Sequence, residues 1–148
     1  MSIAIACDIV VAAETTRFMV AYTRAGLVPD GSSTYFLPRF VGLKRALELT
    51  LTNRMFSAQE ALQWGLITRV VPDHELMQQV KTIAAQLASG PTRAYGISKR
   101  LLHSGWVETL ETQMENESQA IANSARTEDA REGISAFLEK RPPKYKGK

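Results

Sequence analysis

The chain has 148 residues and a formal net charge of +3, with 45% apolar and 22% charged residues. These values are typical of one soluble globular domain, and no apolar run reaches the roughly twenty residues of a membrane helix. The single cysteine, Cys7, excludes an internal disulfide and a cysteine-based metal cluster; we expect it to be a small buried side chain. His74 and His103 lie far apart with no ligand spacing around either, so no metal site is predicted. No signal peptide is recognisable, and we expect a cytoplasmic protein.

The first segment, MSIAIAC, is apolar on all sides, which predicts a buried helix. It has no cap and nothing polar ahead of it, so we expect the chain to begin in mid-fold. Two short strands are predicted next, at 8–13 and 18–22, because both runs are apolar and short. A tight turn at 14–16 joins them, so we expect these strands to pair with each other.

The rest of the chain is organised around residues 18–42, FMVAYTRAGLVPDGSSTYFLPRFVG. Pro29 favours an extended backbone before it, and Asp30 is then well placed to cap an amphipathic helix over 34–41. The Gly-Ser-Ser that follows is small, so another group can approach the backbone closely. A carboxylate in such a place suits a general acid or base. Pro-Asp-Gly is also an ordinary turn signal, so the residues alone leave both interpretations open.

Familiar end signals delimit the next elements. A helix is expected over 42–51, with Leu47 among its inward residues. The sequence SAQE at 57–60 is a capping box, and the helix that it starts should end at Gly65. A strand is predicted at 66–71.

Beyond residue 73 the chain has the pattern of four helices, expected over 74–89, 91–104, 107–124 and 127–140. Pro142-Pro143 forbids any continuation of the last one. Five cations then crowd the end of the chain: Lys140, Arg141, Lys144, Lys146 and Lys148. A basic tail is most often a solvated, frayed end; the alternative is a phosphate-binding surface.

Four stretches resemble the crotonase superfamily of enoyl-CoA hydratases and isomerases. They read ACDIVVAAETTRF, AGLVPDGSSTYFLPRFVG, LTNRMFSAQEALQWGLITRVVP and EDAREGISAFLEKRPPKYKGK, in order over nearly the whole chain. The resemblance implies an α/β fold: the carboxy-terminal part of the ββα spiral, followed by a helical trimerisation region. It divides the chain into a spiral core with the acyl-CoA site, 1–72, and an oligomerisation region with a basic tail, 73–148. Family chains have roughly another hundred residues before this start, about a domain's worth.

Family chemistry holds an acyl-CoA thioester in an oxyanion hole of two backbone N–H groups, while carboxylates move protons at neighbouring carbons. By resemblance, both oxyanion donors precede this chain, so we expect it to be inactive alone. The two glutamates of the hydratases correspond to Ser2 and Tyr22. Hydroxyls ionise far above neutral pH and are poor general bases there. This argues against simple water addition.

Asp30 lies where the peroxisomal-type Δ3,Δ2-enoyl-CoA isomerases and the bacterial phenylacetate-pathway isomerases keep a carboxylate, directly after a proline. The resemblance therefore implies an isomerase of fatty or aromatic acid degradation, with Asp30 as its catalytic residue. Two alternatives stay open: an enoyl-CoA hydratase with degenerate acids, and a non-catalytic assembly module.

The remaining site residues are also implied by resemblance. Tyr22, Ser32 and Tyr35 are expected to line the acyl pocket, although Tyr35 is as easily a core residue. Phe137 and Lys140 are expected to reach the CoA of a neighbouring subunit; the alternative is a core phenylalanine and a solvated lysine. The expected partners are an acyl-CoA substrate and further copies of the chain, as a homotrimer or a dimer of trimers. No cofactor besides the CoA thioester is expected, nor any membrane, and RNA binding through the tail is the least favoured option.

Overall fold

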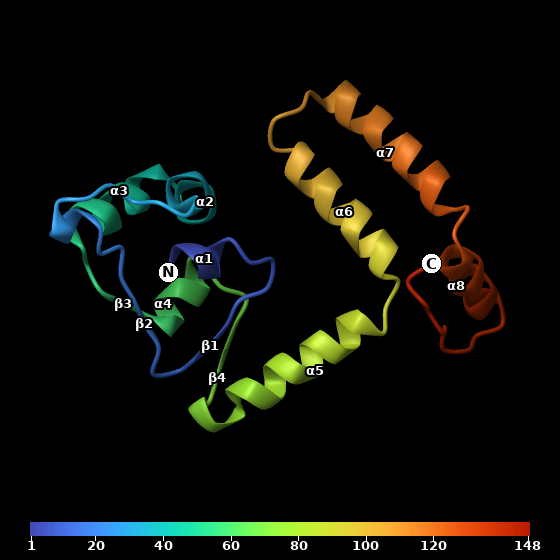
Figure 1. Cartoon of the computed structure of the whole chain (residues 1–148), viewed down its shortest axis with the longest axis horizontal. Coiled ribbons are helices and arrows are strands. Elements are labelled where there is room, and N and C mark those ends of the chain that lie inside the picture. The colour runs from blue at the N-terminus through green and yellow to red at the C-terminus, as the bar shows by residue number, and fades with distance from the viewer. The chain divides into compact units, whose positions relative to one another are not determined.

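The structure, a computed structural model, describes residues 1–148 and separates into two compact units, Met1–Val80 and Lys81–Lys148. Figure 1 shows the four strands and helices α1 to α4 in the first unit and α6 to α8 in the second; α5 crosses the boundary in sequence. The prediction of a few short strands followed by helices is confirmed. The functional boundary expected between residues 72 and 73 stays a prediction. None of the helices is both long and apolar enough to cross a membrane.

Helix α1, Ser2–Ile5, is shorter than predicted and is buried on one side only. Ser2 and Ile5 are buried, whereas Ile3 is 82% exposed and Cys7 is exposed. The predictions of a helix buried all round and of a buried cysteine are therefore wrong. A single helical turn presents one face to the core beneath it, and the other face stays in solvent whatever its composition.

Four short strands form two separate pairs: β1 (Val11–Ala13) parallel to β4 (Arg69–Val71), and β2 (Arg17–Phe18) antiparallel to β3 (Phe56–Ser57). The prediction that the first two strands pair with each other is wrong. The turn between them is bound elsewhere, because the Thr15 hydroxyl donates to the Asp73 carboxylate. Each early strand thus finds its partner far along the chain.

Helices α2, Ser33–Val41, and α3, Leu43–Thr52, are joined by one glycine with a φ of +78° and pack against each other. Ala46 and Leu49 of α3 are buried, but Leu47, predicted to face inward, is 46% exposed. The buried stripe runs through residues three apart, and Leu47 lies at its edge.

Helix α4, Ala58–Gln63, starts with the predicted capping box. The Glu60 amide donates to Ser57 Oγ at 3.2 Å, and the Glu60 carboxylate accepts from the Ser57 amide at 2.9 Å. That backbone hydrogen bond, together with the Arg54 guanidinium, lowers the pKa of Glu60 to about 2. The helix stops before Gly65, which has a φ of +72°, as predicted.

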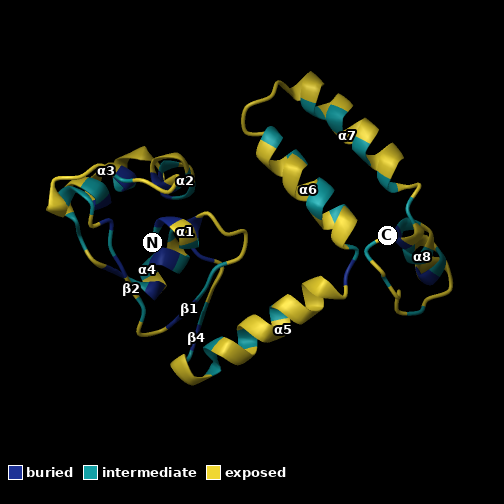
Figure 2. Ribbon diagram, in the orientation of Figure 1, coloured by how far each residue is buried: buried dark blue, intermediate teal, exposed yellow.

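The apolar core lies in the first unit, where Figure 2 shows the dark buried segments of α1 to α4 and the strands. Its largest fully buried side chains include Ile5, Val20, Leu49 and Phe56. The Phe18 and Phe56 rings stack with their centroids 5.5 Å apart. This core holds the loop between β2 and α2, which carries the candidate site.

The four helices predicted after residue 73 are confirmed: α5 (Leu76–Ala88), α6 (Thr92–Ser104), α7 (Leu110–Ser124) and α8 (Glu128–Leu138). Helices α6 and α7 form an antiparallel pair (Figure 1), in which the Gln113 side chain donates to the Leu101 carbonyl at 2.9 Å. Helix α7 begins later than predicted because Thr109 caps it, accepting from the Thr112 amide at 3.3 Å.

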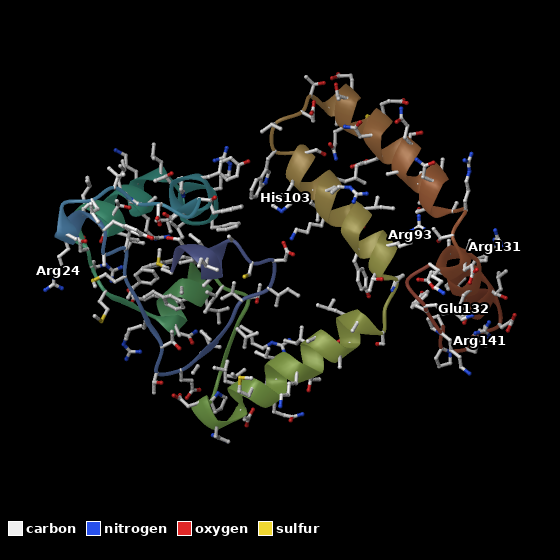
Figure 3. All side chains as sticks on the ribbon, viewed as in Figure 1. Arg24, Arg93, His103, Arg131, Glu132 and Arg141 are labelled. Atoms are coloured by element: carbon white, nitrogen blue, oxygen red, sulfur yellow. The ribbon has the colours of Figure 1, made fainter.

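The basic tail is bound to α8 rather than frayed, which corrects the expectation from composition. The Glu132 carboxylate accepts from the Arg141 guanidinium at 2.6 and 3.0 Å and from the Lys144 amide at 2.8 Å; Figure 3 labels the first two side chains. These bonds, Arg141 first, lower the pKa of Glu132 to about 2. The buried Asp129 carboxylate accepts from the amides of residues 146 and 147 at 2.7 and 2.8 Å. The backbone amides of Lys144, Lys146 and Gly147 therefore anchor the tail.

Candidate functional site

Three polar side chains from different parts of the first unit form a hydrogen-bonded row. Tyr22, at the start of the 3-10 helix Thr23–Ala25, donates its hydroxyl proton to Asp30 Oδ1 at 2.5 Å. The Ser2 hydroxyl on α1 lies 3.2 Å from the Tyr22 hydroxyl. Since the one Tyr22 proton is directed at Asp30, Ser2 is the donor to Tyr22. The three positions singled out by resemblance thus meet in one place.

Asp30 does not cap α2, which corrects one of its two predicted roles. The N-cap is Ser32, with a φ of +64°, and the contact from the helix start goes to the Asp30 backbone. Both the amide and the hydroxyl of Ser33 donate to the Asp30 carbonyl, at 3.1 and 2.7 Å. Gly31 and Ser32 are both left-handed, and this reversal turns the carboxylate toward Tyr22 instead of the helix.

The small residue after Asp30 is needed for close packing. A Cβ built on Gly31 would lie 2.9 Å from the Ser2 Cβ, closer than such atoms normally come, and the φ of Gly31 is +58°. The sequence predicted a close approach to this backbone, and Ser2 of α1 is what approaches. The glycine therefore fixes the distance between α1 and the Asp30 turn.

The row can hold and orient a single carboxylate for proton transfer. Asp30 is exposed, so a substrate can reach it, while Tyr22 is half-buried and Ser2 is 5% exposed. The Tyr22 hydroxyl, which donates to Asp30 Oδ1, fixes the orientation of this carboxylate. Neither hydroxyl is a general base near neutral pH. The geometry therefore supplies one base with two supporting hydroxyls.

An apolar cavity of about 210 Å³ lies beside this turn, between the segment around β2 and helices α2 and α3. Its buried wall is formed by Val20, Leu37 and Ala46, and its outer edge by the exposed Leu43 and Leu47. The cavity gives the first unit an apolar space, open at its outer edge, next to the turn that carries Asp30.

Three residues were predicted to line the acyl pocket, and none of them lines this cavity: Tyr22, Ser32 and Tyr35. Tyr35 is 39% exposed, with the Arg39 guanidinium 3.7 Å from its ring centroid, so it is not a core residue. The roles of these side chains stay predictions.

The predicted CoA-binding residues lie at the end of α8 in the second unit. Phe137 is 83% exposed, so the alternative of a core phenylalanine is wrong. Lys140 is exposed and has a φ of +54°. A large exposed aromatic next to a lysine remains consistent with contact to a nucleotide, and the role itself stays a prediction.

No group of three or more histidine, cysteine, aspartate or glutamate side chains gathers where it could hold a metal ion.

Two features were missed at the level of sequence. The hydrogen bond between Ser2 and Tyr22 had no signal in local spacing, because the side chains are 20 residues apart; only the resemblance, which matches both residues to the hydratase glutamates, associates them. The anchoring of the tail did have a sequence signal. Asp129 and Glu132 are three residues apart on a helix, so they lie on one face, and a basic segment follows them.

Comparison with known proteins identifies the family to which the chain is similar. The family model described as enoyl-CoA hydratase/isomerase matches residues 1–148. Over 147 residues the chain is 40% identical to a "Probable enoyl-CoA hydratase" of Rhodobacter capsulatus and 40% identical to the 1,2-epoxyphenylacetyl-CoA isomerase of Escherichia coli. It covers 57% and 56% of these proteins, which in turn cover 99% of it.

The structural comparison agrees. A crystal structure of an enoyl-CoA hydratase/isomerase family protein from Mycobacterium abscessus superposes with a TM-score of 0.96 at 31% identity, over 99% of this chain and 56% of that one. An enoyl-CoA hydratase from Bacillus anthracis gives 0.90 at 39% identity, over 97% and 56%. The chain spans about half the length of the relatives that it matches. Its order of short strands and helices is thus the carboxy-terminal part of the crotonase fold, and the chain belongs to the enoyl-CoA hydratase/isomerase family.

Proposed function

We propose that the chain carries the acid–base residue of an enoyl-CoA isomerase that shifts a double bond from 3-enoyl-CoA to 2-enoyl-CoA. The observation that carries the proposal is the Asp30 carboxylate, exposed to substrate and held by the Tyr22 hydroxyl at 2.5 Å. The hydroxyl groups of Ser2 and Tyr22 occupy the remaining positions of the row. One carboxylate suffices for isomerisation, since the same group can remove and return a proton.

In this reaction Asp30 takes the proton from C2 of the 3-enoyl thioester, and the electron pair of the broken C–H bond moves toward the thioester oxygen. The same proton is returned to C4 as the double bond moves to C2–C3, so no atom is gained or lost. Tyr22 holds the carboxylate in place during both transfers. We place the donors that stabilise the enolate oxygen outside residues 1–148, and expect these residues alone to show no turnover.

Hydration is the alternative within the same family, and one of the two relatives at 40% identity is named as a hydratase. A hydratase must activate water as well as place a proton. The row offers only one carboxylate for that work, because its other two members are hydroxyls. A 3-hydroxyacyl-CoA product from 2-enoyl-CoA would favour the hydratase.

We further propose that copies of the chain assemble as trimers and that α8 contributes to the CoA site of a neighbour. The support is an apolar group on α8 that contacts solvent: Ile134, Phe137 and Leu138 are 60%, 83% and 74% exposed. Large apolar side chains gathered on one surface are typical of an interaction site. Light scattering would report the oligomer, and Lys140→Ala should weaken CoA binding without changing the chemical step.

The decisive experiment is Asp30→Asn in the full-length enzyme, with conversion of a 3-enoyl-CoA followed by NMR. We expect the rate of isomerisation to fall by a factor of about 10² to 10⁴, the usual contribution of a general base, while CoA binding persists. Asp8→Asn makes the same chemical change in the same unit and should keep full activity. Retained turnover in Asp30→Asn would remove Asp30 from the mechanism.

A further inference from the structure

The apolar cavity beside the Asp30 turn has a closed inner end and an open outer edge. Its inner wall is nearly inaccessible to solvent, since Val20 is 1%, Leu37 3% and Ala46 6% exposed. The outer edge is apolar as well, because Leu43 and Leu47 are 64% and 46% exposed. A space of this kind favours the apolar end of a molecule whose polar part remains outside.

The cavity is physically continuous with the catalytic turn. Pro29, directly before Asp30, is part of its wall, and so is the buried Ser33, whose hydroxyl donates to the Asp30 carbonyl at 2.7 Å. Val20 precedes Tyr22 by two residues on the same segment. A group that enters the cavity is therefore held against the backbone that positions the carboxylate.

The volume limits what fits. Apolar cavities of about 150 Å³ stay dry and bind benzene, and this one is about 210 Å³. The inner space therefore has room for one benzene ring or a chain of about six carbons, and a longer group would extend through the open outer edge.

We propose that this cavity binds the apolar end of the acyl group and that two residues of α3, Ala46 and Thr50, set its size limit. The inference rests on the proposed function for the identity of the ligand, an acyl-CoA. Ala46 forms part of the buried inner wall with a single methyl group, and Thr50 lines the cavity one helical turn further on. A larger side chain at either place occupies space that the acyl group needs.

The first test does not depend on catalytic turnover. It measures the binding of fluorobenzene to the purified protein by ¹⁹F NMR. Fluorobenzene should bind the unmodified protein and lose at least about tenfold in affinity in Thr50→Leu, since that change fills the cavity. Thr52→Leu is the matched control, because it makes the same change on the same helix at an exposed position outside the cavity. Equal binding in both variants, or none in the unmodified protein, overturns the proposal.

The second test asks whether the cavity serves the acyl group, by calorimetry with hexanoyl-CoA and acetyl-CoA, which share the CoA part and carry no double bond. Hexanoyl-CoA should bind the full-length enzyme at least about tenfold more tightly, and Ala46→Leu should remove that difference while acetyl-CoA binding stays unchanged. Circular dichroism confirms that the variant is folded, and Thr50→Leu repeats the test if it is not. Equal affinity of the two thioesters in the unmodified enzyme overturns the proposal.

The two proposals can fail separately. Asp30→Asn leaves the cavity untouched and should keep both the fluorobenzene and the hexanoyl-CoA affinities. If that variant keeps its turnover, the isomerase mechanism is wrong while the cavity result stands. If instead Ala46→Leu retains the preference for hexanoyl-CoA, the cavity proposal is wrong while Asp30 keeps its role.

Discussion

Each of the two units is stabilised internally by a different kind of interaction. Nearly all buried apolar side chains lie in Met1–Val80, whereas in Lys81–Lys148 the only buried apolar residue is Ala136. The second unit relies on helix caps and on the carboxylates of Asp129 and Glu132, and it exposes large apolar side chains such as Trp106, Met114 and Phe137. The difference suggests a division of work. A unit with its own core can position a catalytic carboxylate, and a unit with uncovered apolar faces is suited to contacts with other chains.

A pair of identical substitutions gives the largest test of this contrast. Phe56→Ala should lower the free energy of unfolding by about 3–5 kcal/mol, because Phe56 is 1% exposed and its removal leaves a cavity. Phe137→Ala should change it by less than about 0.5 kcal/mol, because that ring is 83% exposed. Urea unfolding followed by circular dichroism checks both. A large loss of unfolding free energy in Phe137→Ala would show that other protein atoms already cover the Phe137 face of α8 in solution.

The glycine that follows Asp30 offers a finer test within the first unit. Gly31→Ala should cost about 1–2 kcal/mol for its left-handed backbone, plus a further cost for the contact with Ser2. Gly26→Ala is the control, because Gly26 is also left-handed but has open space around it. The difference between the two variants in urea unfolding measures the contact alone. If both variants lost the same free energy of unfolding, α1 would be able to move away from the added methyl group at no cost.

Caps should matter equally in both units, because they act locally. Ser57 accepts from the Glu60 amide at 3.2 Å, and Thr127 accepts from the Ala130 amide at 3.1 Å. Replacing either by alanine should cost about 1 kcal/mol, measured by thermal unfolding. A much larger loss for Thr127→Ala would make this cap a main support of the second unit.

The smallest expected effect is a pH-dependent loosening of the tail. The pKa of Glu132 is lowered from 4.5 to about 2 by Arg141 and the Lys144 amide, so the anchoring is complete above about pH 4.5. It should be lost as the pH falls through about 2, when Glu132 takes up a proton. Amide hydrogen exchange at Lys144 should therefore rise only at acid pH.

Glu132→Gln should raise that exchange already at neutral pH. Glu139→Gln is the control, because Glu139 also pairs with Arg141, at 2.7 Å, but holds no tail amide. Unchanged exchange in Glu132→Gln would show that Asp129 alone anchors the tail.

The sequence was a good guide wherever structure is decided locally. The capping box at Ser57, the stop at Gly65 and the helices after residue 73 follow from side chains within a few positions of one another, and all are present. Strand pairing was mispredicted because β1 selects a partner by burial, far along the chain.

The candidate site could be predicted in part. Asp30 was identified as a possible acid or base, but its orientation depends on left-handed backbone at Ser32, a residue type that rarely adopts it. The contacts with Tyr22 and Ser2 depend on the packing of α1, which no local pattern encodes.

The strand pairs also determine when the first unit can fold. The Val10 amide donates to the Thr68 hydroxyl across a separation of 58 residues, and β1 adds its parallel hydrogen bonds to β4 at the same place. Closing so long a loop costs entropy before any contact offsets it, and contacts between distant residues slow folding. On the ribosome, β1 therefore waits unpaired until β4 has been synthesised and released from the exit tunnel. We expect this interval, rather than the formation of the helices, to set the rate at which the turn that carries Asp30 is assembled.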